Sequence, residues 1–135
     1  MKKNKVIYWA ATGIITLMMV FSAYSYFSKP ELTAAFKHLG FPDYFRIELA
    51  IAKFLGALVL IIPAIPVKIK EWAYAGFAIT FLSATIAHIN SGDPAAMAIT
   101  PLVLLAVLIV SNIYLYKKNQ LTVVNSNQPI KPALA

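Results

Sequence analysis

Long apolar runs separated by short polar segments dominate the chain. A helix needs about 20 apolar residues to cross a hydrocarbon core about 30 Å thick. Four runs meet this requirement, at residues 6–27, 47–65, 72–89 and 98–116. The pattern predicts an all-α integral membrane protein in which residues 6–116 form a bundle of four transmembrane helices. The first run has no small-residue cleavage site, so we expect an uncleaved anchor rather than a signal peptide.

The segment between the first two runs is too polar to cross a membrane, but it has the features of a short helix. Pro30 suits a first helical turn, and Gly40 suits the end of a helix. Leu32, Phe36 and Leu39 form an apolar stripe at helical spacing. We therefore expect a short interfacial helix between the first and second spans.

Composition supports a membrane protein and removes other classes. Hydrophobic residues make up 60% of the chain and charged residues 13%, whereas soluble domains carry about 25% charged residues. The chain has no cysteine, which excludes disulfides, thiolate catalysis and cysteine-bound metal clusters. The net charge of +7 does not indicate nucleic-acid binding, because the lysines stand in short clusters beside the apolar runs.

These lysine clusters predict the orientation of the chain. Basic residues gather in cytoplasmic loops, and three such segments fall on one side of the predicted bundle. They contain Lys2, Lys3, Lys5, Lys68, Lys70, Lys117 and Lys118. We expect a plasma-membrane protein with both termini in the cytoplasm and a basic N-terminus at residues 1–5. The Asn, Gln and Pro content of residues 117–135 predicts a flexible cytoplasmic tail.

Ionisable side chains interrupt the apolar runs near the outer side of the membrane. Glu48 and Lys53 lie in the second run, which descends from the outside. His88 lies near the outer end of the third run, and Asp93 follows it. Charged groups inside a span usually face the protein interior or a cavity. We therefore expect these groups to converge in the outer half of the bundle.

The third run also carries aromatic rings at helical spacing. A pocket lined by these rings, with His88 and Lys53 at its mouth, would suit the flat headgroup of a quinone. The predicted cofactor-binding residues are Glu48, Lys53, Tyr74, Phe77, Phe81, His88 and Asp93.

Each of these residues also has a structural explanation, which the sequence leaves open. The ring stripe fits ordinary helix packing, and Lys53 can pair with Glu48. His88 can finish a wetted helix end. Asp93, in an Asn-Ser-Gly-Asp-Pro turn, can cap the fourth helix.

Metal-binding and catalytic patterns are missing from the sequence. His38 and His88 do not stand in an HxxxH or HxxE spacing, so we predict no metal site. There is no glycine-rich phosphate loop and no Ser-His-Asp order. We therefore assign no catalytic residue.

Four motifs follow one another along the chain: "HLGFPDYF" at 38–45, "KFLGALVLIIP" at 53–63, "IKEWAYAGF" at 69–77 and "ATIAHINSGDP" at 84–94. With Pro101 early in the last run, they resemble the DoxX-like family of small four-span membrane proteins over about residues 10–117. The family pattern includes Lys53, Glu71, Trp72, Tyr74, Gly76, His88, Gly92 and Asp93.

The resemblance implies a compact four-helix membrane bundle. Relatives in the wider group look like membrane subunits of quinone-linked oxidoreductases or oxidative-stress complexes. The resemblance therefore implies that this chain is an accessory membrane subunit of such a complex, with a quinone as cofactor and a protein partner. Because fold alone does not assign function, a non-enzymatic scaffold or assembly factor in the bilayer is the alternative. A small transporter is the weakest choice, since the first run contains no acidic residue.

Overall fold

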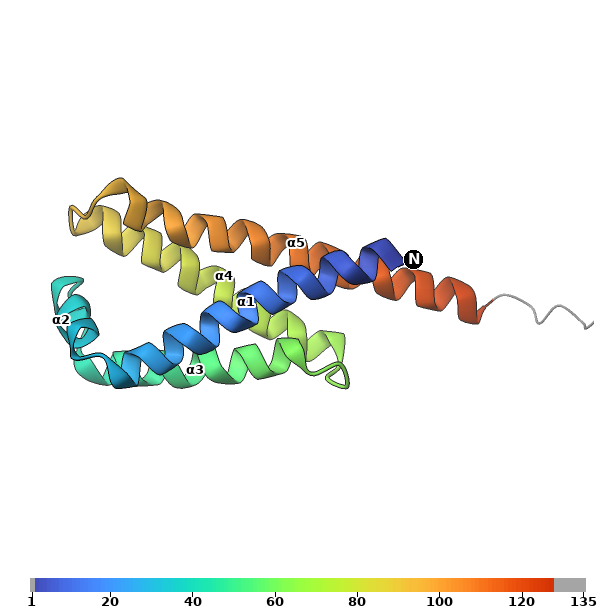
Figure 1. Cartoon of the computed structure of the whole chain (residues 1–135), viewed down its shortest axis with the longest axis horizontal. Helices are drawn as coiled ribbons and strands as arrows, with labels where there is room; N and C mark the ends of the chain where they lie inside the picture. The colour runs from blue at the N-terminus through green and yellow to red at the C-terminus, as the bar shows by residue number, and fades with distance from the viewer. Residues whose placement is uncertain (1, 128–135) are drawn as a thin grey trace, which may run out of the picture.

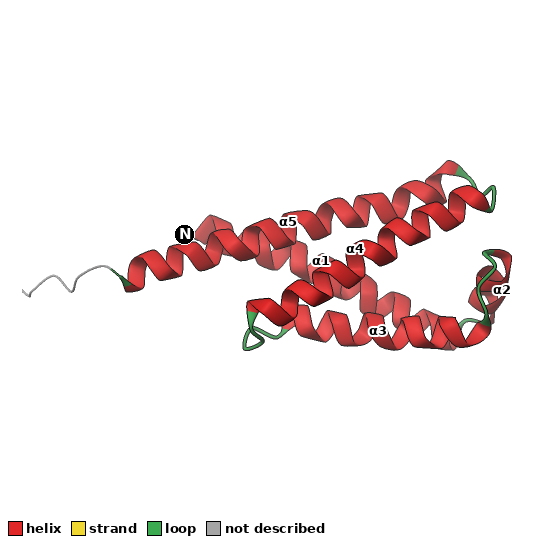
Figure 2. Cartoon of the chain, turned by 180° about the vertical axis from the view of Figure 1, so that it is seen from behind, coloured by secondary structure: helices red, strands yellow, loops and turns green. Residues whose placement is uncertain are grey.

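The structure, a computed structural model, describes residues 2–127 and consists there of five helices without a strand (Figures 1 and 2). The helices are α1 (Lys2–Ser28), α2 (Pro30–His38), α3 (Asp43–Ile61), α4 (Val67–Asn90) and α5 (Ala95–Ser126). The predicted all-α fold is confirmed, and so is a short helix between the first two long ones. That helix, α2, has Pro30 in its first turn and is followed by Gly40 at φ +85°.

Three helices are long and apolar enough to cross a bilayer: α1, α4 and the Ala95–Gln120 part of α5. Helix α3 is 19 residues long but carries Asp43, Arg46, Glu48 and Lys53, and it is not among them. By length and composition the described residues therefore give three spans where the sequence pattern predicted four.

The long helices begin three to five residues before the predicted spans, and two of the predicted C-terminal ends differ from the structure by more than one residue. The second apolar run was predicted to be helical to residue 65, but α3 ends at Ile61. The reason is Pro63, because the residue before a proline avoids the helical conformation, and Ile62 is extended with ψ 116°. Helix α5 passes the predicted end at 116 and reaches Ser126, since residues 117–126 contain no glycine or proline to stop it. The first ten residues of the predicted flexible tail are thus helical, and residues 128–135 lie outside the described part.

The four long helices pack as a closed ring in the order α1, α3, α4, α5. Helices α1 and α4 cross one another in both views (Figures 1 and 2), and each packs against both α3 and α5. The short helix α2 lies across one end of the ring and packs only against α1 and α3. We call this end the α2 end, and the opposite end, where α1 begins, the N-terminal end. The largest buried apolar side chains of the core include Tyr8, Ile15, Met19, Leu60, Tyr74, Phe77, Phe81, Leu108 and Leu115.

Helices α3 and α4 meet at Gly56. A Cβ atom added to Gly56 would lie 2.7 Å from Cζ of Phe77, and Phe77 is 4% exposed. Absence of a side chain at Gly56 therefore lets the Phe77 ring fill the space between the two helices.

Replacing Gly56 by leucine should destabilise the bundle. The new side chain would displace a buried ring, and overpacking of this kind typically costs about 1–3 kcal/mol. Thermal unfolding of the purified protein in detergent measures the loss. Gly76→Leu is the matched control, because Gly76 is an exposed helical glycine on α4 with nothing within 4 Å of an added Cβ. Equal stability of the two variants would contradict this account of the crossing.

Candidate functional site

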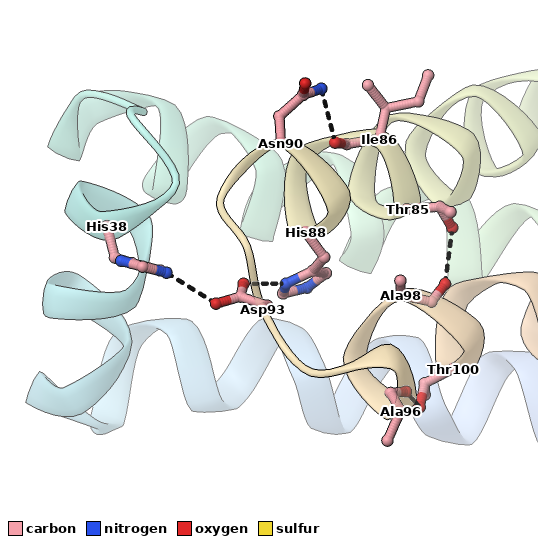
Figure 3. A network of polar contacts seen from close by, with 9 residues as sticks. All are labelled: His38, Thr85, Ile86, His88, Asn90, Asp93, Ala96, Ala98 and Thr100. Carbon is pink, nitrogen blue, oxygen red and sulfur yellow. Dashed lines mark hydrogen bonds and ion pairs between the residues drawn. The ribbon is translucent and has the colours of Figure 1, made fainter.

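His38, His88 and Asp93 form one connected group at the α2 end (Figure 3). Nε2 of His38 lies 2.8 Å from Oδ1 of Asp93, and Nδ1 of His88 lies 2.7 Å from Oδ2 of the same carboxylate. His38 is the last residue of α2, His88 lies in the last turn of α4, and Asp93 lies in the turn before α5. We call these three residues the clasp.

Local backbone geometry places Asp93 over the end of α4. Ser91 ends the helix, and Gly92 has φ +72°, a left-handed conformation that favours glycine. The N–H of Asp93 then donates to the carbonyl of His88 at 3.1 Å. Of the two roles that the sequence left open for Asp93, the hydrogen bonds of the described residues show the carboxylate bonded to two imidazoles.

The clasp is an ionic group with defined donors. Hydrogen bonds from His88, and then from His38, hold the pKa of the Asp93 carboxyl below its ordinary value. An ionised carboxylate only accepts hydrogen bonds, so Nδ1 of His88 and Nε2 of His38 both donate to it. The two rings approach different oxygens, and the described residues contain no group of three ligands placed to hold a metal ion.

Lys53 lies between α3 and α1 and has no carboxylate partner within residues 2–127. Its side chain is 6% exposed. Its ammonium group donates to Ser22 Oγ at 3.0 Å and to Tyr26 OH at 2.6 Å, and it stands 4.2 Å from the centre of the Tyr26 ring. The expected ion pair with Glu48 is not formed: Glu48 is exposed, on the other side of α3 from the buried Lys53.

Lys53 and His88 do not share one site in the way the sequence suggested. Helix α3 begins at Asp43, so Lys53 lies ten residues, or about 15 Å, along it. His88 lies two residues, or about 3 Å, from the end of α4. The polar contacts of Lys53 are with α1, and the side-chain hydrogen bond of His88 is with the α4–α5 turn. The two groups occupy the same half of the bundle at different depths.

The predicted ring-lined pocket is part of the packed core. Phe77 and Phe81 stack with their centroids 6.2 Å apart and are 4% and 3% exposed. The hydroxyl of Tyr74 is hydrogen-bonded to Ser111. A different set of rings begins at Tyr26, which contacts Lys53, and includes Phe36 of α2. It runs from Tyr26 to Phe36 at 5.0 Å and continues to Phe41 and Phe45, which stack at 4.9 Å.

A second polar group, which the sequence analysis missed, is buried toward the N-terminal end. Ser111 on α5 is within 2.7 Å of both Thr12 on α1 and Tyr74 on α4. Thr12 and Ser111 are fully buried. The available signal was a hydroxyl in each of three apolar runs, since such groups must find partners inside the protein.

Lys70 and Tyr8, each one helical turn from Tyr74 or Thr12, form a second set of buried contacts toward α3. The ammonium group of Lys70 donates to the Leu60 carbonyl at 3.1 Å and to the Tyr8 hydroxyl at 3.3 Å, and the side chain is 3% exposed. The carbonyls in the last turn of a helix have no intrahelical partner, so Lys70 caps α3 from the first turn of α4. The charge pattern predicts that Lys70 lies in a cytoplasmic loop, but in the structure its side chain is buried on α4. We call Tyr8, Thr12, Lys70, Tyr74 and Ser111 the inner network.

The next two residues of α4, Glu71 and Trp72, do not take part in the inner network. Glu71 accepts a hydrogen bond from Asn112 on α5 at 2.7 Å. Trp72 is 78% exposed, and with Lys68 and Ile69 it lines an open hollow of about 320 Å³. Glu71 and Trp72 lie near the start of α4, whereas the clasp lies at its other end.

Comparison with known proteins identifies the family. The family model described as the DoxX-like family matches residues 10–111. The chain belongs to the DoxX-like family. No curated protein and no solved structure matches it. In this DoxX-like protein the family match contains Lys53 and the whole clasp, whereas Tyr8 and Asn112, which complete the polar contacts at the N-terminal end, lie just outside it.

Removal of the Lys70 ammonium should destabilise the protein. Lys70→Met leaves the Leu60 carbonyl and the Tyr8 hydroxyl without this donor in a buried place, which should cost roughly 1–3 kcal/mol. Lys68→Met is the matched control, because Lys68 is exposed two residues away. Thermal unfolding in detergent should show a clear loss for Lys70→Met and almost none for Lys68→Met. The account of the inner network is wrong if both variants unfold like the wild type.

The clasp should stabilise the protein in a pH-dependent way. Because the pKa of Asp93 is lower in the folded state than in the unfolded state, its ionised form favours folding. This contribution is present above about pH 4, the ordinary range of an aspartate, and is lost as the pH falls through the folded-state pKa. The Tm of the wild type should therefore exceed that of Asp93→Asn at pH 7, and the difference should narrow only below about pH 4. A difference that already disappears at pH 5.5 would contradict this assignment.

Proposed function

We propose that this DoxX-like protein is a four-span accessory subunit that holds a quinone-type ring in the α2-end half of its bundle for a partner oxidoreductase. The observation that carries the proposal is Lys53, a buried ammonium group with no counter-charge among the described residues. Ionisable groups inside membrane helices are costly and usually mark a functional site.

The surroundings of Lys53 suit a quinone carbonyl. An ammonium group has three N–H donors, and Ser22 and Tyr26 take two of them. The third is available for a ligand oxygen. The adjoining rings Tyr26, Phe36, Phe41 and Phe45 provide flat apolar surface of the kind that binds aromatic headgroups. In this proposal Lys53 binds a ring oxygen, and His88 with Asp93 forms a separate polar position nearer the α2 end.

Helix α3 serves as the fourth span in this proposal. Its 19 residues reach about 28 Å, close to the thickness of the hydrocarbon core. Its charges do not prevent crossing. Asp43 and Arg46 pair at 3.0 Å near the start of the helix, and Arg46 also donates to the Tyr26 carbonyl. Lys53 is satisfied by α1, so among the described charges of α3 only Glu48, near the α2 end, is exposed without an ion pair.

The orientation follows from charge. Lys2, Lys3 and Lys5 begin α1, and Lys117 and Lys118 lie in the part of α5 beyond the predicted span. With both segments in the cytoplasm of a plasma-membrane protein, the α2 end, the clasp and the approach to Lys53 lie on the outer side.

Organic extraction of the gently purified protein, followed by mass spectrometry, tests the function. We expect a quinone in about equal amount to the wild-type chain and a loss of at least tenfold in Lys53→Met, because the methionine cannot donate a hydrogen bond. Lys37→Met is the control, since Lys37 is an exposed lysine at the same end and should retain the quinone. Phospholipid alone in the wild-type extract would overturn the proposal.

A membrane scaffold is the second candidate, favoured by one observation. The exposed Trp72 and Lys68 beside an open hollow offer a surface for a protein partner at the cytoplasmic end, and an exposed aromatic residue is a common anchor in interfaces. In that case Lys53 is structural, and the same extraction yields no quinone from any variant.

A further inference from the structure

The clasp leaves one nitrogen of His88 unused. Asp93 accepts from Nδ1 of His88 at 2.7 Å, and no described residue forms a hydrogen bond with Nε2. A neutral imidazole with its proton on Nδ1 carries a lone pair on Nε2. His88 is 23% exposed at its side chain. A half-buried, oriented hydrogen-bond acceptor therefore lies at the α2 end.

We propose that Nε2 of His88 accepts a hydrogen bond from a ring hydroxyl, so that the clasp is a binding position for the reduced, hydroquinone form of the ligand. The inference rests on the proposed function and adds the redox form that the clasp selects. A quinone carbonyl has only lone pairs and cannot donate to Nε2. A hydroquinone hydroxyl donates, and it alone makes this bond.

Asp93 and His38 act in this proposal as positioning residues. Asp93 fixes the His88 tautomer and the ring orientation, as carboxylates beside functional histidines commonly do. Asp93 is itself held by His38, whose side chain is 56% exposed. Since α2 packs only against α1 and α3, the bond from His38 to Asp93 is a side-chain link between α2 and the α4–α5 turn (Figure 3).

The chemistry of the two polar positions differs. Lys53 only donates hydrogen bonds, so it binds an oxygen of either redox form. Neutral His88, with Nδ1–H committed to Asp93, only accepts on its remaining nitrogen. A site that hydrogen-bonds a ligand hydroxyl rejects an analogue without it strongly, because its polar group is then left unpaired. Discrimination between the redox forms is thus assigned to His88 and not to Lys53.

Binding of decylubiquinol and decylubiquinone to the full chain in nanodiscs, without oxygen at neutral pH, tests the inference. We expect the wild type to bind the quinol at least tenfold more tightly than the quinone. His88→Asn retains an N–H donor near the position of Nδ1 for Asp93 but lacks Nε2. It should therefore lose the preference for the quinol while its affinity for the quinone stays within about twofold of wild type.

Asn90→Ala is the control for this test, because Asn90 is exposed and its side chain donates only to Ile86 of its own helix. It should retain the preference. A ¹⁵N NMR spectrum of histidine-labelled protein adds a readout that needs no ligand: His88 should carry its proton on Nδ1 in the wild type and on either nitrogen in Asp93→Asn.

The outcomes separate the two proposals. A ligand that depends on Lys53 but binds His88→Asn with an unchanged preference overturns the role of His88 and leaves the proposed function intact. A His88 proton on Nε2 in the wild type has the same consequence. Failure of the wild type to bind either redox form overturns both proposals.

Discussion

The structure depends on one constraint: a polar group among apolar helices has no water to bond with, so the chain must supply its partner. Lys70 shows that one buried polar group can link several helices. Its ammonium group meets the Leu60 carbonyl at the end of α3 and the Tyr8 hydroxyl near the start of α1, so one side chain joins three helices. Ser111 does the same for α1, α4 and α5. Each bond is of modest net strength, but the cost of breaking it in a buried place is large, and this fixes the helices against one another at the N-terminal end.

The same constraint is met differently at the two ends. In the inner network the hydrogen-bonding groups are hydroxyls, a carbonyl and one ammonium group, and Ser111 is bonded on two sides. Toward the α2 end, Lys53 is held by neutral groups alone. Nε2 of His88 has no hydrogen-bond partner among the described residues. Groups that a protein orients but does not fully use are the ones able to bind a ligand. Unused hydrogen-bonding capacity, rather than a pocket, is therefore the reason for placing the ligand at the α2 end.

The helices and the turn that carries Asp93 could be predicted from the sequence. The side of α3 that faces the core, and the partners of its charged residues, could not. The apolar runs predicted the long helices, and Pro30 and Gly40 predicted α2. The Asn-Ser-Gly-Asp-Pro sequence predicted the turn that carries Asp93. The rotation of α3 was not predictable. Glu48 and Lys53 are five residues apart, or about 140° around a helix, so they cannot both face inward. The buried arc is Ala50, Lys53, Ala57 and Leu60, and only contact with α1 and α4 selects it. The partners of Lys53 and Lys70 lie up to 62 residues away along the chain, and no local pattern relates them.

The distribution of these contacts also determines which part of the molecule can change shape. At the N-terminal end, buried hydrogen bonds hold the ring of helices together. At the α2 end, α2 packs against α1 and α3 only, and the link to the other half is the His38–Asp93 bond, whose histidine is more than half exposed. Segments with few buried contacts and exposed hydrogen bonds open at the lowest free-energy cost. Loss of the His38–Asp93 bond can therefore free α2 from the α4–α5 turn without disturbing Gly56, Phe77 or the inner network, because the His88–Asp93 bond lies within α4 and the turn that follows it.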